Sequence, residues 1–231
     1  MSVAEQLEHV RGEIRLACGR SGRNPEEVTL IAVSKTKPES MLEEAIAAGQ
    51  DVFGENKVQE MKRKANNLPK NLHWHMIGHL QTNKVRDAVA YAELIHSVDS
   101  LHLAEKIEEE AAKQDKKIPI LLEVNVAEEE SKFGLSMSEV EPLLRQIAAF
   151  PHIQVEGLMT IAPYCDNPED NRPVFRKLHE LFIDMKEKSI DNINMTVLSM
   201  GMTGDYTVAV EEGATMVRVG TGIFGVRNYM V

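Results

Sequence analysis

The sequence alternates between short runs of apolar and β-branched residues and longer amphipathic stretches with helical spacing. The short runs are predicted strands, at residues 28–36, 51–56, 72–80, 94–100, 118–127, 153–163, 194–203 and 215–225. The helical stretches between them cover residues 38–49, 57–67, 81–92, 101–117, 136–150, 171–188 and 204–214. Strands that alternate with helices pair in parallel through βαβ crossovers, and eight such units in 231 residues indicate a closed barrel.

We therefore predict an α/β fold, a single (β/α)8 TIM barrel formed as one domain by residues 1–231. An open, doubly wound sheet is the alternative. Residues 3–20 form an extra helix before the first strand, and we expect it to cap one end of the barrel or to cover its outside. No linker rich in Pro, Gly or Ser interrupts the alternation, which indicates one domain.

Charge and composition exclude several partners. The formal net charge is −10 and no block of Lys and Arg stands out, so we expect no nucleic acid partner. No stretch approaches the ~20 apolar residues that span a bilayer, and the charged N-terminus lacks a signal core, which predicts a cytoplasmic protein without a membrane partner. Cys18 and Cys165 have no metal-ligand spacing, and we expect free thiols and no metal site.

A lysine ends the first predicted strand. Along this strand Ile31, Val33 and Lys35 share one face, and Lys35 comes last. Active sites of this fold assemble at the C-terminal ends of the strands. Partial burial there lowers the pKa of an amine and prepares it to attack a carbonyl. The residues thus predict Schiff-base chemistry at Lys35, with a lysine that only reaches solvent as the alternative.

Glycines and hydroxyls follow the last two predicted strands. Gly201 and Gly204 lie in the first of these turns, and Gly220 and Gly222 in the second. Backbone amides approach a ligand closely at glycine, and nearby hydroxyls can donate to it, from Ser199, Thr203 and Thr221. The loops after strands 7 and 8 form the usual phosphate site of this barrel. We therefore expect a phosphorylated carbonyl compound, with its phosphate site facing Lys35 across the barrel opening.

Seven motifs carry a resemblance to a known family: IAVSKTKP, VFGENKVQE, HMIGHLQTNK, EVNVAEEESKFG, GLMTIAP, LSMGMTGD and VRVGTGIFG. In this order and at these spacings, from residue 31 to 225, the sequence resembles the pyridoxal phosphate homeostasis proteins, whose barrel is similar to the N-terminal domain of alanine racemase. The resemblance implies pyridoxal 5′-phosphate as the cofactor, held by Lys35. It implies cofactor contacts at Asn56, Ser199, Met200, Gly201, Arg218, Gly220 and Thr221.

The same resemblance bears on turnover. The arginine of the racemase-type barrel that matches Arg218 faces the pyridine nitrogen, and a permanent cation there keeps that nitrogen unprotonated and the ring a poor electron sink. In alanine racemase a tyrosine from a second domain serves the opposite face of the substrate, and no such domain is expected here. Tyr91, Tyr164, Tyr206 and Tyr229 are the resident tyrosines, and we expect Tyr164 and Tyr206 to be loop or packing residues.

The resulting hypothesis is a protein that stores, buffers or delivers pyridoxal phosphate, with little or no turnover and no assigned catalytic residue. Apo forms of pyridoxal phosphate enzymes are its expected recipients, and a monomer is its expected state. A small amino-acid racemase is the alternative, and a phosphosugar enzyme with an aldolase-like imine is a third possibility. His73, His75 and His79 lack the acidic or thiol partners of a metal site, and we expect ordinary hydrogen-bonded histidines.

Overall fold

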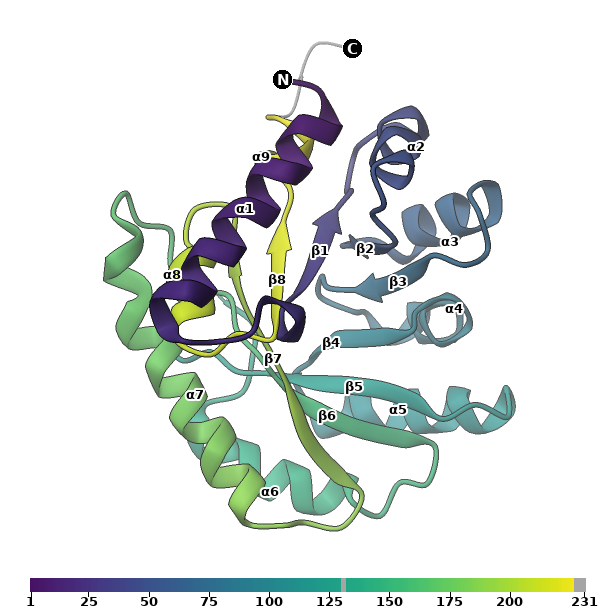
Figure 1. The fold of residues 1–231 in the computed structure, drawn as a ribbon. Coiled ribbons are helices and arrows are strands. Elements are labelled where there is room, and N and C mark those ends of the chain that lie inside the picture. Colours follow the sequence, from purple (N-terminus) through teal and green to yellow (C-terminus); the bar gives the residue numbers. More distant parts are fainter. Residues whose placement is uncertain (130–131, 227–231) are drawn as a thin grey trace.

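The strands close into one parallel barrel. The computed structural model describes residues 1–129 and 132–226. Its strands are β1 (Thr29–Val33), β2 (Val52–Glu55), β3 (His73–Met76), β4 (Leu94–Val98), β5 (Ile118–Glu123), β6 (Ile153–Met159), β7 (Ile193–Met202) and β8 (Met216–Val219). Each strand pairs with the next, and β8 pairs with β1 through Ile31 and Arg218 among others (Figure 1). This closure confirms the predicted barrel and excludes the open sheet.

Helices cover the outside of the barrel (Figure 1). They are α2 (Glu39–Ala47), α3 (Val58–Asn67), α4 (Val85–Tyr91), α5 (Leu101–Lys113), α6 (Met137–Ile147), α7 (Arg172–Glu187), α8 (Tyr206–Glu211) and α9 (Thr221–Phe224), with 3-10 turns η1 (Pro25–Glu27), η2 (Thr82–Lys84) and η3 (Pro168–Asn171). The short α9 differs from the sequence prediction, which extended the eighth strand to residue 225. The strand ends at Val219 because the Gly220 carbonyl accepts from the amides of Ile223 and Phe224 and starts a helical turn.

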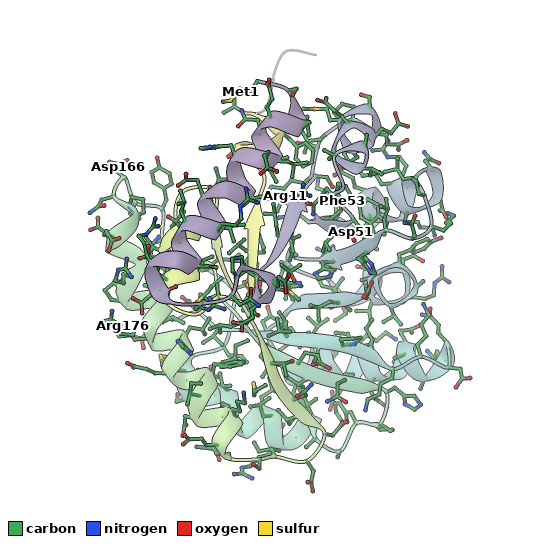
Figure 2. All side chains as sticks on the ribbon, viewed as in Figure 1. Met1, Arg11, Asp51, Phe53, Asp166 and Arg176 are labelled. Atoms are coloured by element: carbon green, nitrogen blue, oxygen red, sulfur yellow. The ribbon has the colours of Figure 1, made fainter. Side chains whose placement is uncertain are left out.

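The N-terminal helix α1 (Val3–Ser21) lies on the outside of the barrel, where it packs against α2, α8 and α9 (Figure 1). Ser2 caps it in a capping box with Glu5. Arg11 donates to the carbonyls of Ala48 and Gly49, at 2.9 and 3.0 Å, and fastens the helix to the loop before β2 (Figure 2). Of the two expected positions, the outer one is confirmed.

Two apolar clusters organise the interior. The larger one fills the layer between the strands and the helices and includes Leu30 and Ala32 of β1. A smaller one lies inside the barrel, where Leu94, Leu121 and Met159 pack together. No described helix is long and apolar enough to cross a membrane. Tyr229 and part of the EVNVAEEESKFG motif lie outside the described residues.

Candidate functional site

Lys35 lies at the mouth of the barrel, which is the end where the strands terminate. It follows the last residue of β1 by two positions and is half-buried. Leu30 and Ala32 pack outward among the helices, and side chains alternate along a strand. Lys35 therefore lies on the face of the strand that points into the barrel. The chain turns at once: the Lys37 amide donates to the Ser34 carbonyl at 3.0 Å, and Thr36 has a φ of 64°. The amine is therefore carried by a tight turn at the rim.

The turn after β8 lies directly beside Lys35. Ala32 of β1 pairs with Val219 of β8, so the residues that follow these two positions are neighbours. A Cβ atom at Gly220 would lie 3.3 Å from the Cβ atom of Val33. The predicted lysine and glycine turn thus meet on adjacent strands. This corrects the expectation that they face each other across the mouth, and the reason is that closure of the barrel makes the first and last strands neighbours.

Backbone amides and a hydroxyl converge in this turn. The amides of Gly220 and Gly222 point at the hydroxyl of Thr203, with nitrogen–oxygen distances of 3.3 and 3.4 Å. A Cβ atom at Gly222 would lie 3.2 Å from the Thr203 methyl carbon and 3.8 Å from its hydroxyl oxygen, so a side chain there would fill the space beside the hydroxyl. We call these three groups the amide cradle. Thr221, between the two glycines, is exposed. Such a donor set suits a phosphate.

Two other predicted residues, Met200 and Gly201, lie near the end of β7, just before Thr203 of the cradle. Gly201 has a φ of 89°, and a Cβ atom there would lie 2.5 Å from the Cβ atom of Ala209. Only glycine therefore lets α8 pack closely against the end of β7. The Met200 side chain is fully buried in the outer apolar cluster. The cofactor contacts that the resemblance implied at both residues stay predictions, and a contact at Met200 would come from its backbone, because its side chain lies in the layer under the helices.

Arg218 is held inside the barrel by neutral groups. Its guanidinium donates to the Ser199 hydroxyl at 2.5 Å and to the Thr160 carbonyl at 2.7 Å. Burial lowers its pKa to about 10, so it remains a cation at neutral pH. Among the described residues, the guanidinium forms no salt bridge. The Ser199 hydroxyl, expected at the phosphate, accepts from Arg218, and its contact with the cofactor stays a prediction.

A pair of buried histidines continues this arrangement. Nδ1 of His96 lies 3.0 Å from the Ser199 hydroxyl, and its Nε2 lies 2.9 Å from Nδ1 of His75. Burial lowers the pKa of His75 to about 4 and holds the pKa of His96 well below its usual range, so both rings are neutral. Sequence reasoning did not single out His96. Its inward position on β4, in the motif IHSVDS, was the available signal.

A buried carboxyl completes the mouth. Glu123 ends β5, which lies opposite β1 in the closed strand order, and the residue is 6% exposed. Burial, together with the charge of Asp99, raises its pKa to about 7. It lines a small cavity of about 150 Å³ with Asn125 and Phe133. Like Lys35, it is a charged residue that ends an apolar run, and this signal was passed over in the sequence.

Asn56 stands at the mouth on the next strand from Lys35. It follows the end of β2 and is half-buried. A Cβ atom at Gly78 would lie 2.7 Å from the Cα atom of Asn56, so the loops after β2 and β3 approach at van der Waals distance. This close approach fixes the backbone of Asn56 beside the turn that carries Lys35.

The histidines of the HWHMIGH segment lie in different surroundings. His73 bonds Glu93 on the exposed rim at the start of β3, whereas His75 points into the barrel toward His96. The His79 ring stacks on Phe133 with their centroids 3.8 Å apart, and its Nδ1 lies 3.4 Å from Asp99. Each ring therefore has its own partner.

Comparisons with known proteins agree with this geometry. The chain matches the family model for the alanine racemase N-terminal domain over residues 7–228. A pyridoxal phosphate homeostasis protein of Aquifex aeolicus is 44% identical over 230 residues, which cover 99% of this chain and 100% of the relative. The structure of PipY from Synechococcus elongatus, solved with PLP bound, is 36% identical and has a TM-score of 0.84, with 97% of this chain and 100% of PipY covered.

A more distant likeness concerns the fold alone. An alanine racemase of Corynebacterium glutamicum is 18% identical and has a TM-score of 0.72, over 96% of this chain and 62% of the racemase. The family model and the Aquifex aeolicus relative, in contrast, match nearly the whole chain. This chain therefore belongs to the family of pyridoxal phosphate homeostasis proteins, built on the barrel of the alanine racemase N-terminal domain.

Proposed function

We propose that this protein binds pyridoxal 5′-phosphate, with Lys35 as the Schiff-base lysine and the amide cradle as the phosphate site. The observation that carries the proposal is the adjacency of a half-buried amine after β1 and the cradle after β7 and β8. Pyridoxal 5′-phosphate supplies an aldehyde, which amines attack, and a phosphate, which needs convergent donors. The PLP-bound structure of PipY supports the same ligand.

We assign Arg218 to the pyridine nitrogen of the cofactor, by its similarity to the matching arginine of the racemase barrel. Its partners, the Ser199 hydroxyl and the Thr160 carbonyl, orient the guanidinium without cancelling its charge. A cation at that position disfavours a second cation on the ring nitrogen. The bound ring would then be a poor electron sink, and amino acids would be turned over slowly or not at all.

A site that binds the cofactor and suppresses its chemistry suits homeostasis. The protein would hold pyridoxal phosphate and release it to apo forms of enzymes that need it, acting as a monomer in the cytoplasm. The names of its relatives, pyridoxal phosphate homeostasis proteins, support this role. The two cysteines, Cys18 and Cys165, are free thiols, as suits a reducing compartment.

One observation favours racemisation as a second candidate. Racemisation needs an acid or base on each face of the substrate carbon. Lys35 serves one face, and Glu123, across the barrel with a pKa of about 7, is a titratable group for the other. The described tyrosines are less suited: Tyr206 is buried on α8, Tyr91 lies on the outer helix α4, and Tyr164 is 94% exposed.

Binding is tested with a change inside the cradle. Gly220→Asp places a carboxylate beside the phosphate and crowds Val33, so we expect the dissociation constant for pyridoxal phosphate to rise at least about tenfold. Gly19→Asp, at an exposed helix position where a Cβ atom meets nothing within 4 Å, is the matched control and should bind normally. Unphosphorylated pyridoxal should bind far more weakly than the phosphate form. Equal affinity for both forms would contradict the proposed site.

Turnover is tested by isotope exchange. Deuterium incorporation at Cα of L- and D-alanine is measured in heavy water with the protein, with its Lys35→Ala and Glu123→Gln variants, and with cofactor alone. The carrier role predicts rates close to those of free cofactor for all three proteins. Exchange many orders faster, lost in both variants, would establish the racemase instead.

A further inference from the structure

A fully buried lysine lies behind the turn that carries Lys35. Lys64, on α3, has no exposed surface. Its ammonium contacts Oε1 of Glu55 at 2.7 Å, Oε1 of Glu60 at 2.8 Å and the Ser34 carbonyl at 2.7 Å. Lysine is almost never buried completely unless it is paired. This set of groups, the Glu55–Lys64–Glu60 cluster, lies on the outer side of the sheet, against the turn that carries Lys35.

The cluster holds both peptide bonds of Lys35. The Ser34 carbonyl, bound by Lys64, belongs to the peptide bond before Lys35. The Thr36 amide belongs to the peptide bond after it, and it donates to Oε1 of Glu60 at 2.7 Å. The Ser34 hydroxyl adds a bond of 2.6 Å to Glu55. The backbone that carries the amine is thus fixed on both sides of one residue by one ion cluster.

The held backbone is strained. Thr36 has a φ of 64°, a left-handed conformation that β-branched residues rarely adopt. Such a residue persists only when its surroundings impose the conformation, and such positions cluster at functional sites. The charge-assisted bond from the Thr36 amide to Glu60 is the kind of contact that imposes it.

Stability alone does not explain the cluster. A buried ion pair often contributes no more than apolar residues of similar volume would, because both ions lose their hydration. Here one carboxylate oxygen, Oε2 of Glu55, has no hydrogen-bond partner among the described residues, and burial raises the pKa of this carboxyl. The cluster therefore includes a buried carboxylate oxygen without a hydrogen-bond partner in the described part of the chain, which costs stability close to the turn of Lys35.

We propose that Lys64 and Glu60, supported by Glu55, are positioning residues that clamp the two peptide bonds of Lys35 and thereby aim its amine into the mouth. This inference rests on the proposed role of Lys35 as the cofactor lysine. It assigns a function to α3, whose Glu60 and Lys64 bond the backbone of the turn at the rim and thereby determine its conformation.

The test uses Glu60, whose side chain is the least buried of the three carboxylate and ammonium groups, at 17% exposed. Glu60→Ala removes the acceptor of the Thr36 amide, Glu60→Gln keeps an acceptor oxygen, and Lys62→Met changes an outer lysine of the same helix that pairs with Asp87. Two quantities are measured: hydrogen exchange of the Thr36 amide in protein without cofactor, and the rate at which pyridoxal phosphate forms a borohydride-trapped adduct on Lys35.

In Glu60→Ala we expect exchange of the Thr36 amide to rise, and adduct formation to slow, each by about tenfold or more, as follows from losing one charge-assisted bond. Glu60→Gln should recover most of both quantities, and Lys62→Met should match the wild type. Unchanged exchange and adduct rate in Glu60→Ala would overturn the clamp while leaving Lys35 as the cofactor lysine. An adduct on another lysine in the wild type would instead defeat the proposed function, with the exchange result still reporting on the turn.

Discussion

The two sides of the mouth hold their key side chains by opposite means. On the side of β1 and β2, the turn of Lys35 is fixed from outside the barrel by charged groups, Glu55, Glu60 and Lys64. On the side of β7 and β8, Arg218 is fixed from inside the barrel by neutral groups, a serine hydroxyl and a backbone carbonyl. The ammonium of Lys64 is neutralised by its partners, whereas the guanidinium of Arg218 is oriented but keeps its charge.

The difference indicates what each side is for. A charged cluster under a helix can lock a backbone turn, because strong bonds reach both peptide groups of Lys35. Inside the barrel the hydrogen-bond partners of Arg218 are neutral. The carboxyls whose charges act on it, Glu123 and Asp205, form no salt bridge with it among the described residues, so its cation stays available to a ligand. Burial keeps His75 and His96 neutral, so the Ser199 hydroxyl is not drawn into a second charged network.

Breaking the Glu55–Lys64–Glu60 cluster should have the greatest effect on stability. Lys64→Met removes the ammonium and leaves two carboxylates close together without compensation, which we expect to lower the free energy of unfolding by about 3–5 kcal/mol. Lys62→Met, which breaks only a partly exposed pair with Asp87, should cost less than about 1 kcal/mol. Urea unfolding of both variants measures the difference. Similar small losses in both would show that the cluster is not a structural clamp.

The next effect concerns Glu123, on β5 opposite β1. Burial raises the pKa of its carboxyl from 4.5 to about 7. Between these values the unfolded chain releases the proton and the folded chain keeps it, so the carboxyl contributes progressively less stability as the pH rises from 4.5 through 7. We therefore compare the free energy of unfolding of Glu123→Gln with that of the wild type at two pH values. The difference, variant minus wild type, should be larger at pH 8 than at pH 4 by up to about 3 kcal/mol.

Unfolding free energies of both proteins at the two pH values provide the measurement. The contribution of His75, whose lowered pKa makes the wild type lose stability as the pH falls from 6.5 toward 4, is present in both proteins and cancels in the difference. A difference between variant and wild type that does not change with pH would mean that Glu123 titrates as an ordinary carboxyl.

The smallest effect tests the neutral side. Ser199→Ala removes one partner from both Arg218 and His96, and we expect a loss of about 2 kcal/mol in the free energy of unfolding. Because Ser199→Ala removes a neutral group and breaks no ion pair, the loss of unfolding free energy should stay below that of Lys64→Met in the same urea experiment. A loss as large as that of Lys64→Met would remove the contrast between the two sides.

Most of the fold was predictable from the sequence. Alternating strands and amphipathic helices specify a barrel because each strand buries both faces. For the same reason the sequence left open which face of the first strand points inward, and the outward packing of Leu30 and Ala32 in the structure decides it. The eighth strand was drawn too long, since periodicity alone does not reveal that Gly220 starts a helical turn.

The site was harder to predict because it depends on contacts between distant segments. Ser199 reads as a phosphate ligand next to a glycine, but its hydroxyl is taken by Arg218, a partner 19 residues away. Lys64 reads as a solvated lysine of a basic helix, although it falls on the buried stripe formed by Val58, Met61 and Ala65. Its position on an apolar stripe was the sign that Lys64 is buried and paired with carboxylates.

We propose that Lys35, and no other lysine, carries the cofactor. The most direct measurement loads the protein with pyridoxal phosphate, reduces it with borohydride and maps the modified peptide by mass spectrometry. We expect the pyridoxyl adduct on the peptide that contains Lys35, and within that peptide on Lys35 itself. An adduct on Lys37, whose ammonium already donates to the carbonyls of Phe224 and Gly225, or on the exposed Lys57 would contradict it.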